Sequence, residues 1–185
     1  MTIEYSVVTS IYNDGDEALL FCEEIEKVFS SLAKEVVPLT CTEVIFVDDG
    51  STDDSLEKIL EVQKKYDFVK VIELSRNFGQ HEALACGFLH AKGKYVIRLN
   101  VDMQDSPHEI PKLLKEIETG DYDLVVGQYK VRNSSLLDRL TAYLYFVFFK
   151  ALTGLSVPQQ TSPLRVMNRN FLSEYNKLTE KSRFP

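Results

Sequence analysis

Oxygen-bearing side chains recur at alternate positions in the segment Asn100-Val101-Asp102-Met103-Gln104-Asp105, which follows a short apolar run. Alternate residues of an extended chain point the same way, so Asn100, Asp102 and Gln104 would converge as three oxygen ligands. Hard divalent cations take such ligands, and magnesium commonly takes one or two carboxylates together with substrate phosphates. The segment therefore predicts a metal site that works with a nucleotide diphosphate. An acidic loop that caps the next helix is the alternative interpretation.

Two adjacent acids, Asp48 and Asp49, follow another apolar run and precede Gly50 and Ser51. Adjacent carboxylates repel each other, so a site that holds both usually supplies donors such as a base N–H, a ribose hydroxyl or a cation. The same residue types also suit a turn followed by a helix cap. Both interpretations stay open for this segment taken alone.

The loop from Ser75 to Gln80 combines Arg76, an asparagine and a glycine ahead of a helical pattern. Backbone N–H groups and a guanidinium at a helix N-terminus suit an anion, although an ordinary capped turn has the same composition. The glycine spacing of phosphate-cradling loops is missing. His81, His90 and His108 show neither metal-ligand spacing nor a nucleophile arrangement, and we expect them on helix faces.

Short apolar runs alternate with helical patterns along the chain. The runs expected as strands are Tyr5–Ile11, Val44–Val47, Val69–Leu74, Tyr95–Leu99 and Leu124–Gly127. The segments expected as helices are Asp16–Ala33, Ser51–Tyr66, His81–His90 and Pro107–Glu118. This alternation is typical of the α/β class, with an open, mainly parallel, Rossmann-like sheet and helices on both faces. Ligands of such sheets bind outside the carboxyl ends of the strands, where the polar segments fall.

Charge is distributed unevenly over the 185 residues. Residues 1–127 carry 12 Lys and Arg against 25 Asp and Glu, whereas residues 128–185 carry 9 against 3. The acidic part argues against nucleic acid as a partner. The basic, aromatic-rich part suits phosphates of a ligand or of an anionic membrane surface, and a chance excess of solvated lysines would look the same.

The cysteine content and the hydropathy of the chain predict its cellular compartment and its relation to a membrane. Three unpaired cysteines argue against a disulfide framework and a zinc site, and so predict a reducing compartment. The first residues lack the basic stretch and apolar core of an export signal. No apolar run reaches the roughly 20 residues of a spanning helix. The aromatic-rich segment Leu140–Leu152 suits either a helix at a membrane surface or a buried helix.

Taken together, these segments resemble the family 2 glycosyltransferases of GT-A fold, and most of all the branch that transfers sugars to polyprenyl or dolichyl phosphate. The resemblance rests on ordered segments along nearly the whole chain, namely Tyr12-Asn13, Val47–Asp53, Leu74–Gly79, Ala83-Leu84 with Gly87, Asp102–Asp105, Pro107, Ile110-Pro111, Tyr122-Asp123, and Arg165 with Met167. It implies an inverting, metal-dependent glycosyltransferase of hexosyltransferase type. The implied donor is a nucleotide sugar, with a UDP-sugar favoured, and the implied acceptor is a polyprenyl phosphate at the cytoplasmic face of the cell membrane.

Two alternatives keep the donor site. One is transfer to a saccharide hydroxyl in cell-envelope polysaccharide synthesis, and the other is a degenerate homologue that binds a nucleotide sugar without turnover. The resemblance implies that Asp49 contacts the nucleotide base, that Asp48 supports this pocket, and that Tyr12 and Asn13 line it. Arg76 is expected among the same donor-binding residues.

The resemblance also implies the residues of the reaction centre. Asp102 and Gln104 would bind Mg²⁺ or Mn²⁺ against the diphosphate, with Asn100 beside them. Arg132 and Arg165 would face the phosphate of a lipid acceptor or the donor diphosphate. These four residues, Asp102, Gln104, Arg132 and Arg165, form the predicted catalytic set.

The chain departs from the family pattern in several places. Asn100 stands where the first aspartate of an Asp-x-Asp motif is usual, and Tyr129 stands where an arginine is common. Thr161-Ser162-Pro163-Leu164 replaces the usual Gly-Asp-Phe before Arg165, and Ser10 replaces a usual proline. We expect one domain over residues 1–185, with a nucleotide-sugar-binding core in 1–127 and an acceptor or membrane-proximal part in 128–185. Members of the branch often continue into transmembrane helices, and we expect a truncation before them here.

Overall fold

The computed structural model describes residues 4–33, 42–129 and 161–178, together with residues 141, 145, 147, 148, 151, 152 and 154. In this part of the chain, the strands are β1 (Tyr5–Ile11), β2 (Thr42–Asp48), β3 (Val69–Glu73), β4 (Tyr95–Arg98), β5 (Leu124–Gln128) and β6 (Thr161–Asn168). The helices are α1 (Ala18–Ala33), α2 (Ser55–Lys65), α3 (Gln80–His90), α4 (Ile110–Thr119) and α6 (Arg169–Lys177), with 3₁₀ turns η1 (Gly15–Glu17) and η3 (Pro107–Glu109).

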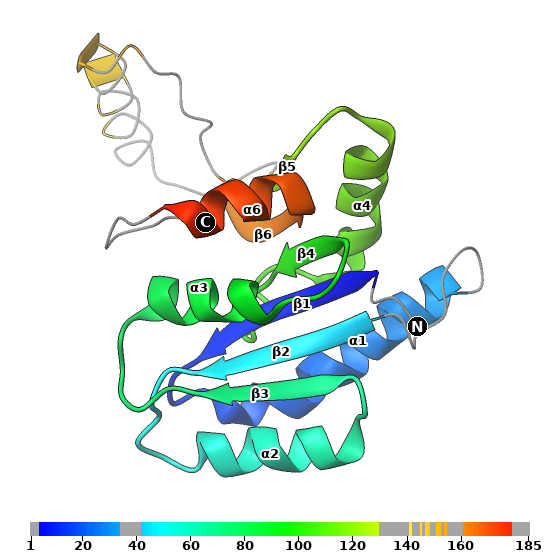
Figure 1. Cartoon of the computed structure of the whole chain (residues 1–185), viewed down its shortest axis with the longest axis vertical. Coiled ribbons are helices and arrows are strands. Elements are labelled where there is room, and N and C mark those ends of the chain that lie inside the picture. Colours follow the sequence, from blue (N-terminus) through cyan, green and yellow to red (C-terminus); the bar gives the residue numbers. More distant parts are fainter. Residues whose placement is uncertain are drawn as a thin grey trace. The chain divides into compact units, whose positions relative to one another are not determined.

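The strands form one sheet in the order β3-β2-β1-β4-β6-β5 (Figure 1). The pairs β1–β2, β1–β4 and β2–β3 are parallel, whereas β6 runs antiparallel to β4. The predicted α/β class with a mainly parallel sheet is confirmed. Because the parallel strands end at one edge, the loops after β1, β2, β3 and β4 gather there.

Helices cover both faces of the sheet, as expected from the continuous apolar strands. Val7 and Phe46 point toward one face and belong to a buried cluster with residues of α1, α2 and α4. Val8 and Ile45, their neighbours along the strands, point the other way and pack against α3 and α6. Burial of one such apolar side chain contributes roughly 1.5–3 kcal/mol, so both faces stabilise the sheet.

Contacts divide the chain into two compact units, Met1–Val126 with Pro163–Pro185, and Gly127–Ser162. Most of β6 and all of α6 therefore belong to the same unit as residues 1–126. The sequence does not predict β6 as a strand, because Pro163 and Arg165 interrupt its apolar residues. Its alternating burial, with Leu164 and Val166 inside, is the pattern of a strand with unlike faces.

Helix α2 begins later than predicted. Ser51 does not cap it, since its hydroxyl group donates to the Asp48 carboxylate. The helix begins at Ser55, whose backbone N–H donates to the Asp53 carboxylate at 3.0 Å. Residues 51–54 therefore form part of the strand-end loop. Ser106 caps the turn η3, because its hydroxyl accepts from the backbone N–H of His108 at 3.3 Å.

The segment Leu140–Leu152 lies mostly outside the described residues. Its described positions include Tyr145, Phe148 and Leu152, all of which are exposed. No described helix combines the length and apolar character needed to cross a membrane. Cys22 is buried and Cys86 half-buried, both as free thiols, and Cys41 lies outside the described residues.

A buried carboxylate near the amino ends of the strands stabilises the sheet. Glu43 on β2 accepts hydrogen bonds from the hydroxyl of Ser6, from the backbone N–H of Lys92 at 2.6 Å, and from the ammonium of Lys70. The Ser6 hydroxyl in turn accepts from the backbone N–H of Gly93 at 2.7 Å. Burial raises the pKa of Glu43, but these hydrogen bonds together bring it below its usual value.

A Glu43→Gln variant should therefore be less stable near neutral pH by about 2 kcal/mol, because hydrogen bonds to a charged group contribute about 1.5–3 kcal/mol each. A lowered folded-state pKa means that this stability exists above the unfolded pKa and disappears as the pH falls through the folded value. Urea denaturation of both proteins across that range should show the difference shrinking in acid. Glu174→Gln is the control, since its pair with Lys177 is exposed and worth under about 1 kcal/mol. A difference that is constant with pH would contradict the role of the charge.

Candidate functional site

A cavity of about 260 Å³ opens at the carboxyl edge of the sheet. Its lining residues come from the end of β1, from the loops after β1, β2 and β3, and from the start of α3, and they are Ser10, Ile11, Tyr12, Asp14, Asp49, Asn77, Gly79 and Gln80. Two of the predicted donor-binding residues, Tyr12 and Asp49, lie in this lining. The position matches the rule that open α/β sheets bind ligands outside the carboxyl ends of their strands.

Asp49 is buried at the end of β2 and organises the loop after β3. Its two carboxylate oxygens accept from the backbone N–H groups of Phe78 at 2.8 Å and Gly79 at 2.9 Å. A carboxylate offers about four lone-pair positions, so these bonds leave acceptor capacity for a ligand N–H. Asp49 can therefore hold the loop and face a ligand at once.

Asp48, unlike Asp49, is not among the residues that line the cavity. It is buried, and its oxygens accept from the backbone N–H of Ser51 at 3.2 and 3.3 Å and from the Ser51 hydroxyl. The adjacent acids thus have separate sets of donors, which relieves their mutual repulsion. The supporting role of Asp48 remains a prediction, and its contacts provide a structural basis for it.

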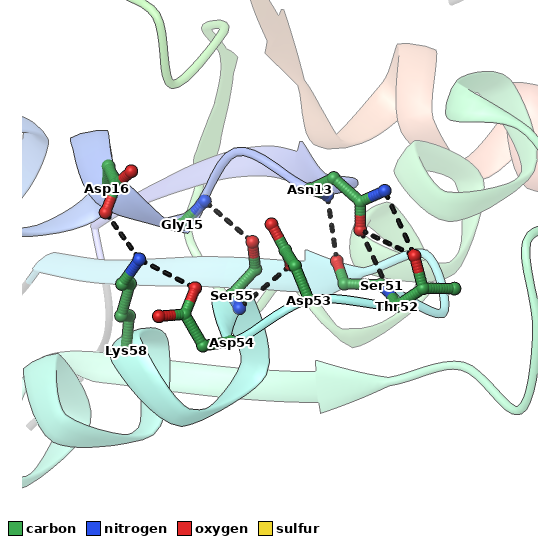
Figure 2. A network of polar contacts seen from close by, with 9 residues as sticks. All are labelled: Asn13, Gly15, Asp16, Ser51, Thr52, Asp53, Asp54, Ser55 and Lys58. Atoms are coloured by element: carbon green, nitrogen blue, oxygen red, sulfur yellow. Dashed lines mark hydrogen bonds and ion pairs between the residues drawn. The ribbon is translucent and has the colours of Figure 1, made fainter.

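Asn13 joins the loop after β1 to the loop after β2 (Figure 2). Its backbone N–H donates to the Ser51 hydroxyl at 3.1 Å, and its side-chain oxygen accepts from the backbone N–H of Thr52 at 2.8 Å. The left-handed φ of 55° is one that asparagine tolerates better than most residues. Asn13 is absent from the cavity lining, so its side chain positions the two loops. Tyr12, at 46% exposure, lines the cavity itself.

The same connection continues through Gly15, whose backbone N–H donates to the Ser55 hydroxyl at 2.9 Å. A Cβ at this glycine would lie 2.5 Å from the Cα of Ser55, so the close approach requires glycine. Farther along, the Lys58 ammonium group contacts Asp16 at 2.5 Å and Asp54 at 2.7 Å (Figure 2). These contacts fix the first loop against the second beside the cavity.

The segment after β4 is a turn, which corrects the extended geometry expected from the sequence. Its last sheet-like bond runs from the backbone N–H of Leu99 to the Val8 carbonyl. The backbone N–H of Met103 then donates to the Asn100 carbonyl at 3.3 Å, and Met103 has a φ of 50°. Asp102 and Gln104 are exposed, and the Asp102 carboxylate accepts from the backbone N–H of Gln104 at 3.3 Å. Alternation along a strand therefore does not bring these side chains together.

Asp14 is a further acid of this edge that the sequence analysis did not select. Burial and repulsion from the Asp102 carboxylate raise its pKa, with smaller contributions from Asp16 and Asp53. Asp14 lines the cavity, so it connects the cavity to the turn that carries Asp102. Its place directly after Tyr12-Asn13 at a strand end is the signal that could have identified it.

The donor set at this edge fits a hard divalent cation completed by substrate phosphates. Asp102 and Gln104 supply exposed oxygens, and Asp14 supplies a second carboxylate that repels the first. Within the described residues, no three His, Cys, Asp or Glu side chains are grouped as a complete metal site. Magnesium commonly needs only one or two protein carboxylates when phosphates supply the other ligands.

The model of a known family matches most of this chain. The family is described as "Glycosyl transferase family 2", and its model covers residues 6–175. The chain belongs to glycosyl transferase family 2. The predicted family membership is thereby confirmed.

Curated relatives of this family 2 chain include an uncharacterized glycosyltransferase and a sugar transferase with a named acceptor. An uncharacterized glycosyltransferase of Synechocystis sp. is 32% identical over 186 residues, which cover 100% of this chain and 56% of the relative. The undecaprenyl-phosphate 4-deoxy-4-formamido-L-arabinose transferase of Photorhabdus laumondii is 32% identical over 180 residues, covering 97% of this chain and 53% of the relative. The chain thus spans about half the length of these relatives.

Solved structures share the fold of the family 2 chain. The mannosyltransferase PcManGT of Pyrobaculum calidifontis, in complex with GDP-Man and Mn²⁺, matches with a TM-score of 0.61 at 18% identity, over 94% of this chain and 47% of that one. The glucosyl-3-phosphoglycerate synthase of Mycobacterium tuberculosis, in complex with Mn²⁺, UDP and phosphoglyceric acid, matches with a TM-score of 0.63 at 21% identity, over 90% and 56%. The expected GT-A fold is confirmed.

The remaining predicted residues of the family 2 chain are distributed over several elements. The guanidinium of Arg76 lies 4.8 Å from the centre of the Phe78 ring, outside the cavity lining. Arg165 lies on β6 and is half-buried, whereas Arg132 lies outside the described residues. Of the departures from the family pattern, Tyr129 is exposed and Ser162 is buried.

An Asp14→Asn variant of the family 2 chain should bind Mn²⁺ in the presence of UDP roughly 10-fold more weakly, as is typical when a group supporting a metal site is lost. The metal-free variant should melt at a higher temperature near neutral pH, because one of two repelling carboxylates is removed. Calorimetric titration and thermal unfolding measure both effects. Asp67→Asn, an exposed acid between α2 and β3, is the matched control. Equal Mn²⁺ affinity in Asp14→Asn and in the parent chain would exclude Asp14 from the metal site.

Proposed function

We propose that this chain carries the catalytic domain of an inverting, metal-dependent glycosyltransferase. The donor is a nucleotide diphosphate sugar, with a UDP-sugar favoured, and the acceptor is a polyprenyl phosphate at the cytoplasmic face of the cell membrane. The observation that carries the proposal is the cavity at the carboxyl edge, where Tyr12, Asp14 and Asp49 meet beside the Asp102 turn.

The donor nucleotide would occupy this cavity. Asp49 has free acceptor capacity for a base N–H, and the Tyr12 ring offers an aromatic face for the same base. Asn13 and Asp48 act indirectly in this scheme, since they hold the loops that bear Tyr12 and Ser51. The nucleotides bound in the solved structures with the same fold, GDP-Man in one and UDP in the other, support a nucleotide in this role.

Asp102 and Gln104 would hold Mg²⁺ or Mn²⁺, with Asn100 as an oxygen ligand beside them. When bound, the ion neutralises charge on the departing diphosphate, a Lewis-acid contribution. Asn100 provides an amide oxygen where a carboxylate is usual, so the protein contributes less negative charge there. Asp14 supplies a compensating carboxylate at the same edge.

In the transfer itself, an acceptor oxygen attacks the anomeric carbon while the bond from this carbon to the diphosphate oxygen breaks on the opposite side. A phosphate acceptor is already ionised near neutral pH, so the protein needs no strong general base. Arg132 and Arg165 would face the phosphate of the acceptor. The name of the Photorhabdus laumondii relative, an undecaprenyl-phosphate transferase, supports this class of acceptor.

The proposed location of the chain at a membrane surface rests on the segment Leu140–Leu152. Its described positions Tyr145, Val147, Phe148 and Leu152 are exposed and apolar. Exposed aromatic and aliphatic side chains of this kind are typical of helices that lie at a membrane surface. The lipid acceptor would meet the protein there.

Transfer to a saccharide hydroxyl is the second candidate, and it would require a catalytic base to deprotonate that hydroxyl. Ser162 stands where the family usually has a carboxylate, which favours the phosphate acceptor. A nucleotide-sugar-binding homologue without turnover is the third candidate, and Asn100 favours it.

An acceptor panel separates these functions. The chain is incubated with Mn²⁺, UDP-sugars and GDP-mannose, and with farnesyl phosphate in detergent or an oligosaccharide mixture as acceptor. Glycosylated farnesyl phosphate, detected by mass spectrometry, is the expected product. Glycosylated oligosaccharide alone would favour the second candidate. Donor binding without any product, unchanged in Asn100→Asp, would favour the third.

A further inference from the structure

Two arginines lie side by side on adjacent antiparallel strands. Arg98 is the last residue of β4, and Arg165 on β6 is its direct cross-strand partner. Directly opposite residues have Cβ atoms about 5 Å apart and share one face of the sheet. This is the face of Val96 and Met167, which pack under α3 and α6. The two guanidinium groups therefore project from neighbouring positions on the same side (Figure 1 shows the two strands together).

Neither arginine has a carboxylate partner among the described residues. Arg98 is only 6% exposed and Arg165 is half-buried, and the Nε of each is buried without a hydrogen-bond partner in the described part of the chain. Burial and the charge of Arg165 lower the pKa of Arg98 to about 10, and the other group that faces it is the Tyr175 phenol. Burial alone lowers the pKa of Arg165. Both side chains remain cationic near neutral pH.

Such an arrangement is unfavourable without an anion. Like charges directly opposite each other in a sheet destabilise it, and a buried charge without a counter-ion costs several kcal/mol. Guanidinium groups bind phosphate through paired N–H donors, and two adjacent groups can enclose one phosphate. An anion with two negative charges would compensate both side chains.

The arginine pair is close to the donor cavity. Arg98 stands opposite Val8 in the register of β1 and β4. Ser10, two residues farther along β1 on the same face, lines the cavity. Two residues of strand span roughly 7 Å. A group bound at the pair would therefore be a near neighbour of a donor in the cavity.

We propose that Arg98 and Arg165 together form a binding site for a phosphate group. Arg98 is the residue that this proposal adds to the site. The phosphate enters from the side of Arg165, which is the more exposed of the two arginines. The source of the phosphate rests on the proposed function, in which it belongs either to the lipid acceptor or to the donor diphosphate. Binding of inorganic phosphate does not depend on that function.

The test compares the parent chain with Arg98→Met, which keeps a long side chain and removes the charge. Thermal unfolding and calorimetry are recorded with inorganic phosphate, with farnesyl phosphate in detergent, and with UDP and Mn²⁺. We expect phosphate to raise the melting temperature of the parent chain. Arg98→Met should melt higher than the parent without phosphate and should bind phosphate at least about 10-fold more weakly, since the charge-assisted hydrogen bonds from Arg98 to the phosphate are lost.

The probes distinguish the two sources. A loss of farnesyl phosphate affinity with unchanged UDP affinity assigns the pair to the acceptor, and the reverse assigns it to the donor. Arg169→Met is the control. The Arg169 guanidinium donates to the Ala91 carbonyl at 2.7 Å, so this variant loses a hydrogen bond that stabilises the fold. It should lower stability and leave the phosphate response unchanged. Arg98→Lys, which keeps the charge, should retain part of the phosphate response and covers the case in which Arg98→Met does not fold.

Equal phosphate affinity in the parent chain and in Arg98→Met, or no phosphate binding by the parent, would overturn the inference. If Mn²⁺-dependent UDP binding is present in that case, the proposed function survives without this site. If phosphate binding depends on Arg98 but no nucleotide binds, the site stands and the proposed function fails.

Discussion

An Asp102→Ala variant should lose about 10²–10³-fold in sugar transfer, because a metal ion that stabilises the leaving diphosphate contributes several kcal/mol. Asp102 is an exposed carboxylate of the turn after β4 and is expected to carry most of the negative charge offered to the ion. Its removal leaves Gln104 and Asn100, which are neutral oxygen ligands, with Asp14 as the remaining carboxylate at this edge. The same variant should lose the Mn²⁺ dependence of UDP binding.

Steady-state transfer assays and calorimetry measure both effects, and thermal unfolding provides the check on folding. The variant should remain folded, because within the described residues the Asp102 side chain makes a single hydrogen bond, from the backbone N–H of Gln104 at 3.3 Å. Asp67→Ala, at the opposite edge of the sheet, is the matched control and should transfer normally. Full Mn²⁺-dependent activity in Asp102→Ala would show that the metal is held elsewhere.

A Gly50→Ala variant should be less stable by about 4 kcal/mol. Gly50 follows Asp49 with a φ of 69°, a conformation that costs an L-residue roughly 1–2 kcal/mol. A Cβ there would lie 2.6 Å from the Cα of Arg76 and 2.7 Å from the backbone nitrogen of Asn77. Displacing this backbone adds an overpacking cost of about 1–3 kcal/mol.

The displaced loop is the one that Asp49 holds through Phe78 and Gly79, so the variant should also bind UDP more weakly. Gly154→Ala is a close control, because Gly154 has the same φ of 69° and no atom of the described residues lies within 4 Å of an added Cβ. It should show the conformational cost alone. Urea denaturation gives both free energies of unfolding. Equal losses in the two variants would mean that the contact with Arg76 and Asn77 does not constrain the chain.

The sequence predicts the parallel part of the sheet well, because its strands are short apolar runs buried on both faces. Tyr5–Ile11 is recovered with its observed bounds, and the other parallel strands differ by a residue or two at their ends. The strand ends then locate the cavity edge, since parallel strands finish together. The sequence does not predict strand β6, because its polar and apolar residues alternate around Pro163. Such a pattern indicates a strand less clearly than a continuous apolar run does.

The site is less predictable than the fold, because it depends on loop conformations. The left-handed φ of Met103 turns the chain after Asn100, and no residue type at this position signals it. The sequence predicts Asn13 as a residue that lines the nucleotide pocket, whereas in the structure it joins two loops. Its hydrogen bonds to Ser51 and Thr52 depend on how these loops, from distant parts of the sequence, meet. The proximity of Asp14 to Asp102 arises in the same way. The roles of Asp49, Asp102, Gln104 and Arg165 remain predictions for experiment.

Calorimetric titration of the chain with UDP, UDP-sugars and GDP-mannose, with and without Mn²⁺, tests the central claim most directly. We expect saturable binding of at least one of these ligands that requires Mn²⁺ and is lost in Asp102→Ala. Absence of metal-dependent binding for every one of them, with a chain shown to be folded, would contradict the assignment of the cavity as a nucleotide-sugar site.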